Sequence, residues 1–292
     1  LSFQDHVSWE RWVFSVLSRI EYVQFKHLEN SNETERKDSV FVPGLGVLYK
    51  LNNEISVRVS VNQAVTVAGL DDQGSEAKEE STNYELGFKY ISSHRSEQAD
   101  LVVFYNDYAN LTGTCTTSAG CGSTQVDQQF NGGAALVKGV EARLAKGFLW
   151  NKLWVPVQAN VTWLDATFQN SFVANTPEWG PQNAQVEVGD PLPYVPQIQY
   201  SLIIGSEWRK FRQDLAFIYQ SKMYDQSAQA GRLEVEPYGI VDWSGHYELS
   251  SRGKIFAKVD NLLGRDYMAA IRPFGYRPGK PQSFMVGISY AF

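Results

Sequence analysis

The stretch from Ser283 to Phe292, SFMVGISYAF, decides the fold, because its side chains alternate in character from one residue to the next. One set is apolar and mostly large: Phe284, Val286, Ile288, Tyr290 and Phe292. Alternation with a period of two predicts a β-strand with one apolar face. Chain ends usually fray and are polar. An aromatic end on the apolar face therefore indicates a strand that is held by a protein core or by lipid.

The same alternation recurs along the chain. It is clearest in four segments: 55–62 (ISVRVSVN), 84–90 (YELGFKY), 153–163 (LWVPVQANVTW) and 241–249 (VDWSGHYEL). In each segment Val, Leu, Tyr, Phe or Trp occupies one face, and the opposite face is largely polar or small. The pattern predicts roughly 13 strands, with no helical segment between them.

The predicted connections between strands alternate in length. The short ones are 9–11, 51–54, 149–152, 209–212 and 250–253, and the long ones are 29–39, 63–81, 112–127, 169–195, 224–236 and 262–281. Short turns at one rim and long loops at the other are typical of an outer-membrane barrel.

Composition restricts the class of protein. The 292 residues are 43% hydrophobic and 13% aromatic, and the mean hydropathy is −0.31. We find no apolar run long enough for a transmembrane helix, whereas a transmembrane barrel stays possible because its strands are only half apolar. The net charge of −6 argues against nucleic acid as the main partner.

A soluble sandwich or propeller is the competing architecture, since it would also alternate. Three features favour the membrane: the strands are about ten residues long where soluble sheets use about five or six, the long loops share one side, and aromatic residues gather near strand ends. These aromatic residues are Trp12, Tyr22, Tyr49, Tyr84, Tyr90, Trp163, Trp208, Trp243 and Tyr290. The sequence thus predicts an all-β protein, an antiparallel transmembrane β-barrel.

Two cysteines, Cys115 and Cys121, lie in the small, polar segment TGTCTTSAGCGST. Their setting predicts a loop closed by a local disulfide, and hence an oxidising compartment. Two free thiols in a loop are the alternative. Without a nearby histidine, the pair makes a poor zinc site.

Several motifs together resemble one family. VDNLLGRDYMAA (259–270) is similar to a penultimate-strand signature, and RPFGYRPGKPQSFMVGISYAF (272–292) to a last loop and terminal strand. TNYELGFKY (82–90), FYNDYANLTGTC (104–115), QFNGGAALVKGVEARL (129–144) and GDPLPYVPQIQYSL (189–202) also match. The chain resembles the C-terminal part of TonB-dependent outer-membrane receptors, most closely those of the ferric-dicitrate type.

The resemblance implies a plugged barrel of about 22 strands. Residues 1–292 would be one C-terminal portion of that barrel and supply about 13 strands, with the plug, the TonB box and the first strands outside this chain. Tyr290 and Phe292 would form the terminal signal that the barrel-assembly machinery reads. The location implied is the outer membrane of a Gram-negative bacterium, among lipid and lipopolysaccharide.

The function implied is uptake of a ferric chelate, either ferric citrate or a siderophore, with energy delivered by TonB, ExbB and ExbD. The ferric chelate is cargo, so no cofactor is expected, and no bond is made or broken, so no enzyme is expected. Scattered histidines (His6, His27, His94 and His246) and the lack of a GxSxG motif speak against an outer-membrane enzyme. A passive porin-like channel is the alternative function, and an N-terminal plug and TonB box would discriminate against it.

Substrate contact is predicted in the last long loop, at Arg272, Tyr276, Arg277 and Lys280, because an anionic chelate favours cationic and polar ligands and this loop holds three cations and an aromatic residue. The alternative is that the arginines pair with loop carboxylates or with lipopolysaccharide phosphates. On the inner wall we expect a hydrated lattice of charges, made by Arg58, Lys89, Arg143 and Lys258 with Glu85, Glu141, Asp242 and Glu248.

Overall fold

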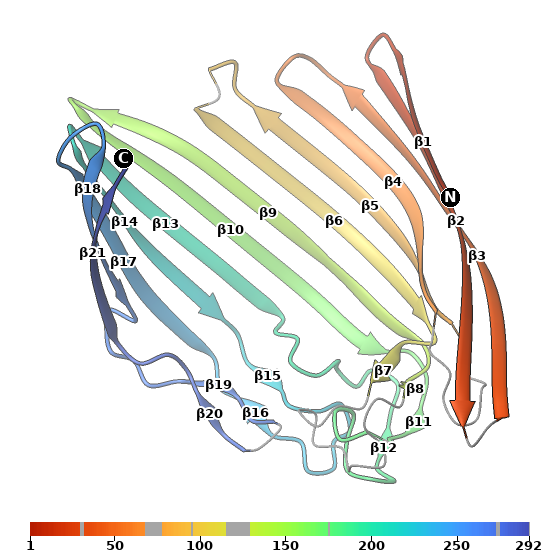
Figure 1. The fold of residues 1–292 in the computed structure, drawn as a ribbon. Helices are drawn as coiled ribbons and strands as arrows, with labels where there is room; N and C mark the ends of the chain where they lie inside the picture. The colour runs from red at the N-terminus through yellow and green to blue at the C-terminus, as the bar shows by residue number, and fades with distance from the viewer. Residues whose placement is uncertain are drawn as a thin grey trace.

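The computed structural model describes residues 1–29, 32–67, 78–94, 96–114, 129–174, 176–272 and 275–291. Its main feature is a 13-stranded antiparallel sheet (Figure 1). The strands are β1 (Ser2–Trp9), β2 (Trp12–Glu29), β3 (Asn32–Lys50), β4 (Ile55–Thr66), β5 (Glu79–Ile91), β6 (Glu97–Ala109), β9 (Ala135–Trp150), β10 (Leu153–Phe168), β13 (Ile198–Trp208), β14 (Phe211–Gln220), β17 (Tyr238–Glu248), β18 (Gly253–Asp260) and β21 (Ser283–Tyr290). No helix that could cross a bilayer occurs in the described ranges.

Each interior strand pairs with the sheet strands that come before and after it in chain order. The sheet curves into an open trough, with β1 and β21 as its two edges (Figure 1). Four small hairpins lie in the long connections: β7 (Thr112–Thr114) with β8 (Gln129–Asn131), β11 (Phe172–Val173) with β12 (Gln185–Val186), β15 (Met223–Tyr224) with β16 (Glu234–Val235), and β19 (Met268–Ala270) with β20 (Arg277–Pro278). The prediction of about 13 strands is confirmed.

From β3 onward, short and long connections alternate as predicted, but the connection between β2 and β3 is also short. Three of the predicted short turns have two residues, and each contains a residue in the left-handed region, at Glu10, Asn151 or Arg209. Two-residue hairpin turns require a residue with a positive φ. A further short turn, which was not among those predicted, joins β5 to β6.

One predicted long loop, 29–39, is wrong. β2 and β3 run for 18 and 19 residues, and their ladder continues to the pair Glu29–Asn32. The segment NETERKD (32–38) has no apolar alternation, and this lack predicts a loop. A ladder that rises above the lipid has water on both faces, so it keeps its backbone pairing without apolar side chains.

The apolar faces of neighbouring strands stay in register across the sheet. One row runs Val16, Leu45, Val61, Tyr84 and Tyr105 through direct cross-strand pairs. The predicted apolar set of the last strand continues this outer face as far as Tyr290, while Phe292 lies outside the described residues. Because large apolar side chains such as Leu86 and Val286 are 51% and 76% exposed, this face suits lipid as its solvent.

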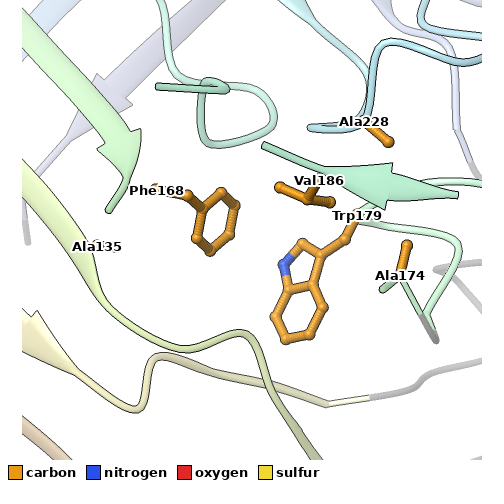
Figure 2. Packing of buried hydrophobic residues seen from close by; sticks show 6 residues of the cluster. All are labelled: Ala135, Phe168, Ala174, Trp179, Val186 and Ala228. Carbon is orange, nitrogen blue, oxygen red and sulfur yellow. The ribbon is translucent and has the colours of Figure 1, made fainter. Parts of the chain in front are cut away.

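The main buried hydrophobic cluster lies at the long-loop rim, where Ala135 and Phe168 at the ends of β9 and β10 pack with residues of the long connections. Figure 2 shows the Phe168 ring beside Trp179 and Val186; the ring centroids of Phe168 and Trp179 are 6.1 Å apart and nearly perpendicular. The full cluster is Ala135, Phe168, Ala174, Trp179, Val186 and Ala228. A Cβ at Gly132 would lie 2.8 Å from the Trp179 ring, so glycine is required for this close approach. The connections thus have a core of their own.

The outer face gives the first prediction. Leu86, near the middle of β5, should be replaceable by Arg only at a cost of about 2–4 kcal/mol, because the charge would enter hydrocarbon. Urea titration of the protein of native length in bilayers, followed by heat-modifiable migration in gels, measures the loss. Ser60→Arg is the matched control, since its position faces Glu85 on the inner wall and should cost little. Equal losses from both variants would contradict the assignment of the faces.

Candidate functional site

Three long connections meet at one rim of the sheet, opposite the short turns (Figure 1). They are 169–197 between β10 and β13, 221–237 between β14 and β17, and 261–282 between β18 and β21; we call them the loop cap. In outer-membrane barrels the long-loop rim is extracellular. The loop cap is therefore the candidate site of first contact with a ligand.

A buried ion pair joins the first connection to the second. Arg232 lies 2.6 Å from Asp190, whose side chain is only 4% exposed. The other carboxylate oxygen of Asp190 accepts a hydrogen bond from the backbone N–H of Glu187, and Arg232 also donates to the carbonyl of Ser227. The Arg232 guanidinium packs over the Tyr224 ring. Such a desolvated, multiply bonded pair fixes the relative position of two connections.

A second buried pair joins the third connection to the other two. Arg272 Nε donates to Asp225 Oδ2 at 2.9 Å, and its Nη2 donates to Gln226 Oε1 at 2.5 Å. The backbone N–H of Arg272 donates to the Tyr194 hydroxyl at 2.8 Å. Asp225 is fully buried and also accepts a hydrogen bond from the N–H of Leu233. A small apolar cluster of Met223, Val235 and Ile271 packs beside this network.

These contacts decide how Arg272 is used in the structure. Arg272 pairs with a loop carboxylate, that of Asp225, which is the alternative to substrate contact that the sequence left open. Removing the guanidinium would leave the Asp225 carboxylate buried without a counter-charge, which is a costly change. Arg272 is accordingly a positioning residue of the loop cap, and its contact with substrate stays a prediction.

The other three predicted contacts lie along the same connection. Tyr276 is 66% exposed, and Arg277 is exposed while donating to the carbonyl of Arg272. Lys280 bonds to Asp260 at the end of β18. The structure therefore presents an aromatic ring and a guanidinium to solvent and uses Lys280 at the base of the connection.

Asn261 anchors the base of this connection. It is 2% exposed and adopts a left-handed conformation, and its side chain spans the connection. Its Nδ2 donates to the carbonyls of Arg265 and Lys280, and its Oδ1 accepts from the N–H of Arg265. This arrangement gives the Asn of the VDNLL stretch a structural role.

The inner wall carries the predicted cations, but the ion pairs they form use acids outside the predicted set, as in the pair of Lys258 with Asp260. Arg58 on β4 reaches across β5 to Asp100 on β6, at 3.7 Å. Its side chain passes over Gly87, where a Cβ would lie 2.7 Å from it. Lys89 and Arg143 both stand opposite Asp100 in the ladder. Within the described ranges, no group of three or more His, Cys, Asp or Glu residues could hold a metal ion.

Burial affects the charge of one carboxyl in the loop cap. Burial raises the pKa of Glu178, next to the clustered Trp179, above its ordinary value. Burial disfavours the ionised carboxylate, so ionised Glu178 lowers the stability of the folded cap at neutral pH. This loss of stability disappears as the pH falls below the raised pKa and the carboxylate is protonated.

The remaining predicted residues cannot be placed. Cys115 and Cys121 lie outside the described residues, as does Phe292, so the disulfide and the assembly signal stay predictions. Sequence reasoning also missed Asp190, Tyr194, Asp225 and Arg232. Their partners are 42 to 78 positions away in the chain for the contacts between connections, and no local pattern announces them.

Comparison with known proteins identifies the family. The family described as "TonB dependent receptor-like, beta-barrel" matches residues 1–262. The ferrioxamine B receptor of Salmonella typhimurium (strain SL1344) is 24% identical over 302 aligned positions, which cover 99% of this chain and 40% of the receptor. The chain thus spans about two fifths of the length of the curated relatives it matches.

Solved structures agree on the fold. The ferric-catecholate import receptor Fiu from E. coli K12, in its closed form, superposes with a TM-score of 0.75 at 16% identity, covering 100% of this chain and 44% of Fiu. The unliganded ferric citrate transporter FecA gives a TM-score of 0.75 at 15% identity, covering 99% of this chain and 44% of FecA. The chain belongs to the TonB dependent receptor-like β-barrel family, and its sheet is part of a barrel in the outer membrane of a Gram-negative bacterium.

Proposed function

We propose that this chain forms the barrel wall and loop cap of an outer-membrane receptor that takes up a ferric chelate with energy from the TonB system. The family match over 262 residues carries the proposal. The names of the relatives support it, since ferrioxamine B, ferric catecholates and ferric citrate are all ferric chelates. Both the cargo and the partners TonB, ExbB and ExbD belong to the proposal.

Binding would use the outward-facing groups of a cap that is already folded. The cation of Arg277 suits the carboxylate or hydroxamate oxygens of a chelate, and the Tyr276 ring offers apolar area with one hydroxyl. Because buried ion pairs and the Trp179 cluster already fix the cap, little ordering entropy is lost when the ligand arrives. The chain contributes recognition and a wall for passage.

A closed wall needs strands on both free edges of the sheet. β1 and β21 each pair on one side, and lipid does not tolerate unpaired backbone groups. We infer that further strands pair with these edges in the working receptor. The gated passage itself belongs to that whole assembly, with a plug and a TonB box as the family resemblance implies.

The second prediction tests the transport. A strain that lacks the gene encoding this chain should lose uptake of radiolabelled iron supplied as one of three chelates: citrate, a hydroxamate or a catecholate. Returning the gene should restore that uptake only when TonB works, because the energy comes from the inner membrane. Uptake that continues without TonB would contradict the receptor and favour the passive porin-like channel.

The third prediction separates contact from positioning in the last connection. Tyr276→Ala and Arg277→Gln should each weaken chelate binding about tenfold or more, since a hydrogen bond to a charged group contributes roughly 1.5–3 kcal/mol. Tyr276→Ala should leave hydrogen exchange in the loop cap unchanged, and Arg277→Gln should change it little, because the bond that it loses, to the carbonyl of Arg272, is exposed. Titration of the purified receptor with the chelate that it transports measures the affinity.

Arg272→Gln should behave differently. It leaves Asp225 buried without its counter-charge, at a cost of about 3 kcal/mol, so amide exchange across 221–237 should accelerate more than a hundredfold. Lys222→Gln is the matched control, because its pair with Glu234 is exposed and contributes at most about 1 kcal/mol. Unchanged exchange in the Arg272 variant would contradict the positioning role.

A further inference from the structure

The rim of short turns carries a surplus of exposed cations. This turn rim comprises the turns that join β1 to β2, β3 to β4, β5 to β6, β9 to β10, β13 to β14 and β17 to β18, with the strand ends beside them. Its exposed cations are Arg11, Lys50, Lys152, Arg209, Lys210 and Arg252. They are distributed over five of the turns, so they form a band along the rim and not a single cluster.

These cations are not neutralised by the protein. Among the residues that the structure describes, none of the six forms one of the ion pairs that are closer than 4.0 Å. Acidic residues at the same rim already have other partners: Glu97 pairs with Lys146, and Glu207 with Arg212. Glu54 accepts hydrogen bonds from Ser93. Exposed Glu248 stands opposite exposed Lys254 in the ladder, which leaves Glu10 and Glu54 as the rim acids without a cationic partner among the described residues, against six cations.

The loop cap is the opposite case. Arg232 and Arg272 are paired with buried aspartates, and Lys222 and Lys280 with exposed or half-buried carboxylates. Both rims contain basic residues, but among the described residues of the cap only Arg265 and Arg277 lack an ion pair, and both donate to backbone carbonyls. The positive charge that can act on an external partner is therefore greater at the turn rim.

Aromatic side chains indicate the depth of the turn-rim cations in the membrane. Trp12 and Tyr49 lie side by side on the outer face, with ring centroids 4.5 Å apart, directly beside the turn that holds Arg11. The Arg209 guanidinium lies 4.8 Å from the centre of the Trp208 ring. Trp and Tyr on a lipid-facing surface mark the headgroup level. Cations one or two residues beyond them lie at the level of the phosphates, and long basic side chains adapt to it by bending along apolar neighbours.

We propose that the turn rim is a binding surface for the headgroups of anionic phospholipids. Short turns face the periplasm in barrels of this class, and the periplasmic leaflet is the phospholipid leaflet of the outer membrane. A net positive band at phosphate depth attracts anionic headgroups, and the attraction is screened by salt. Neutral, zwitterionic lipids have no net charge for the band to select. This inference does not depend on the cargo of the receptor.

The test uses the protein of native length, reconstituted in phosphatidylcholine bilayers. Traces of spin-labelled phosphatidylglycerol or phosphatidylcholine report, by electron paramagnetic resonance, the fraction of each lipid that is immobilised at the protein surface. At low salt we expect phosphatidylglycerol to be preferred about threefold or more. In 1 M NaCl, where the screening length is about 3 Å, the preference should fall close to one.

Two triple variants determine which rim causes the preference for phosphatidylglycerol. Lys152→Gln/Arg209→Gln/Lys210→Gln should lose most of it, whereas the matched triple Lys222→Gln/Arg265→Gln/Lys280→Gln at the loop cap should keep it. Heat-modifiable migration checks that both variants are folded, and the salt titration of the parent protein decides the outcome if either variant is not. The proposal is overturned by equal association of the two lipids, by a preference that salt does not reduce, or by equal losses in the two triples.

Discussion

The structure depends on one constraint, the pairing of every backbone N–H and C=O group that lies in hydrocarbon. Water is absent there, so each unpaired group would cost several kcal/mol. An antiparallel ladder of consecutive strands satisfies the constraint with short turns of two to five residues at one rim, longer connections at the other and no crossover, and this is the topology of the sheet. The side chains are then free to differ between the two faces. The outer face takes Leu, Val, Phe and Tyr, and the inner face keeps Ser, Asn, Arg and Asp.

The constraint also explains which parts of the molecule the sequence could predict. Alternation in 55–62 or 283–290 follows directly from a strand with lipid on one side, and it identified the strands and the faces. Above the lipid the pattern lost its meaning, because 32–38 forms a strand with polar residues on both faces. Backbone pairing alone leaves no trace in the side-chain pattern.

The contacts within the loop cap could not be predicted from the sequence for a different reason. Its contacts join residues that are far apart in sequence, such as Tyr194 and Arg272, and their geometry exists only after the sheet has brought the connections to one rim. Sequence reasoning found the right connection for Arg272 but assigned its charge to a ligand. The decisive fact, the fully buried partner Asp225, lies 47 positions earlier in a segment with no recognisable motif. Solvent exposure separates Tyr276 from Arg272 in a way that residue type cannot.

The two rims use the same residue types in opposite ways. At the cap, Arg232 and Arg272 are matched by aspartates inside the protein, which gives fixed connections on which a few exposed groups can be presented accurately. At the turns the backbone geometry is already set by left-handed residues such as Asn151 and Arg209, so no ion pair is required to hold them. Their cations stay available to the surroundings. In such a barrel, most charges of the loop cap pair within the protein, whereas the cations of the turn rim are free to bind lipid headgroups. This difference distinguishes the two rims of a sheet whose strands are otherwise alike.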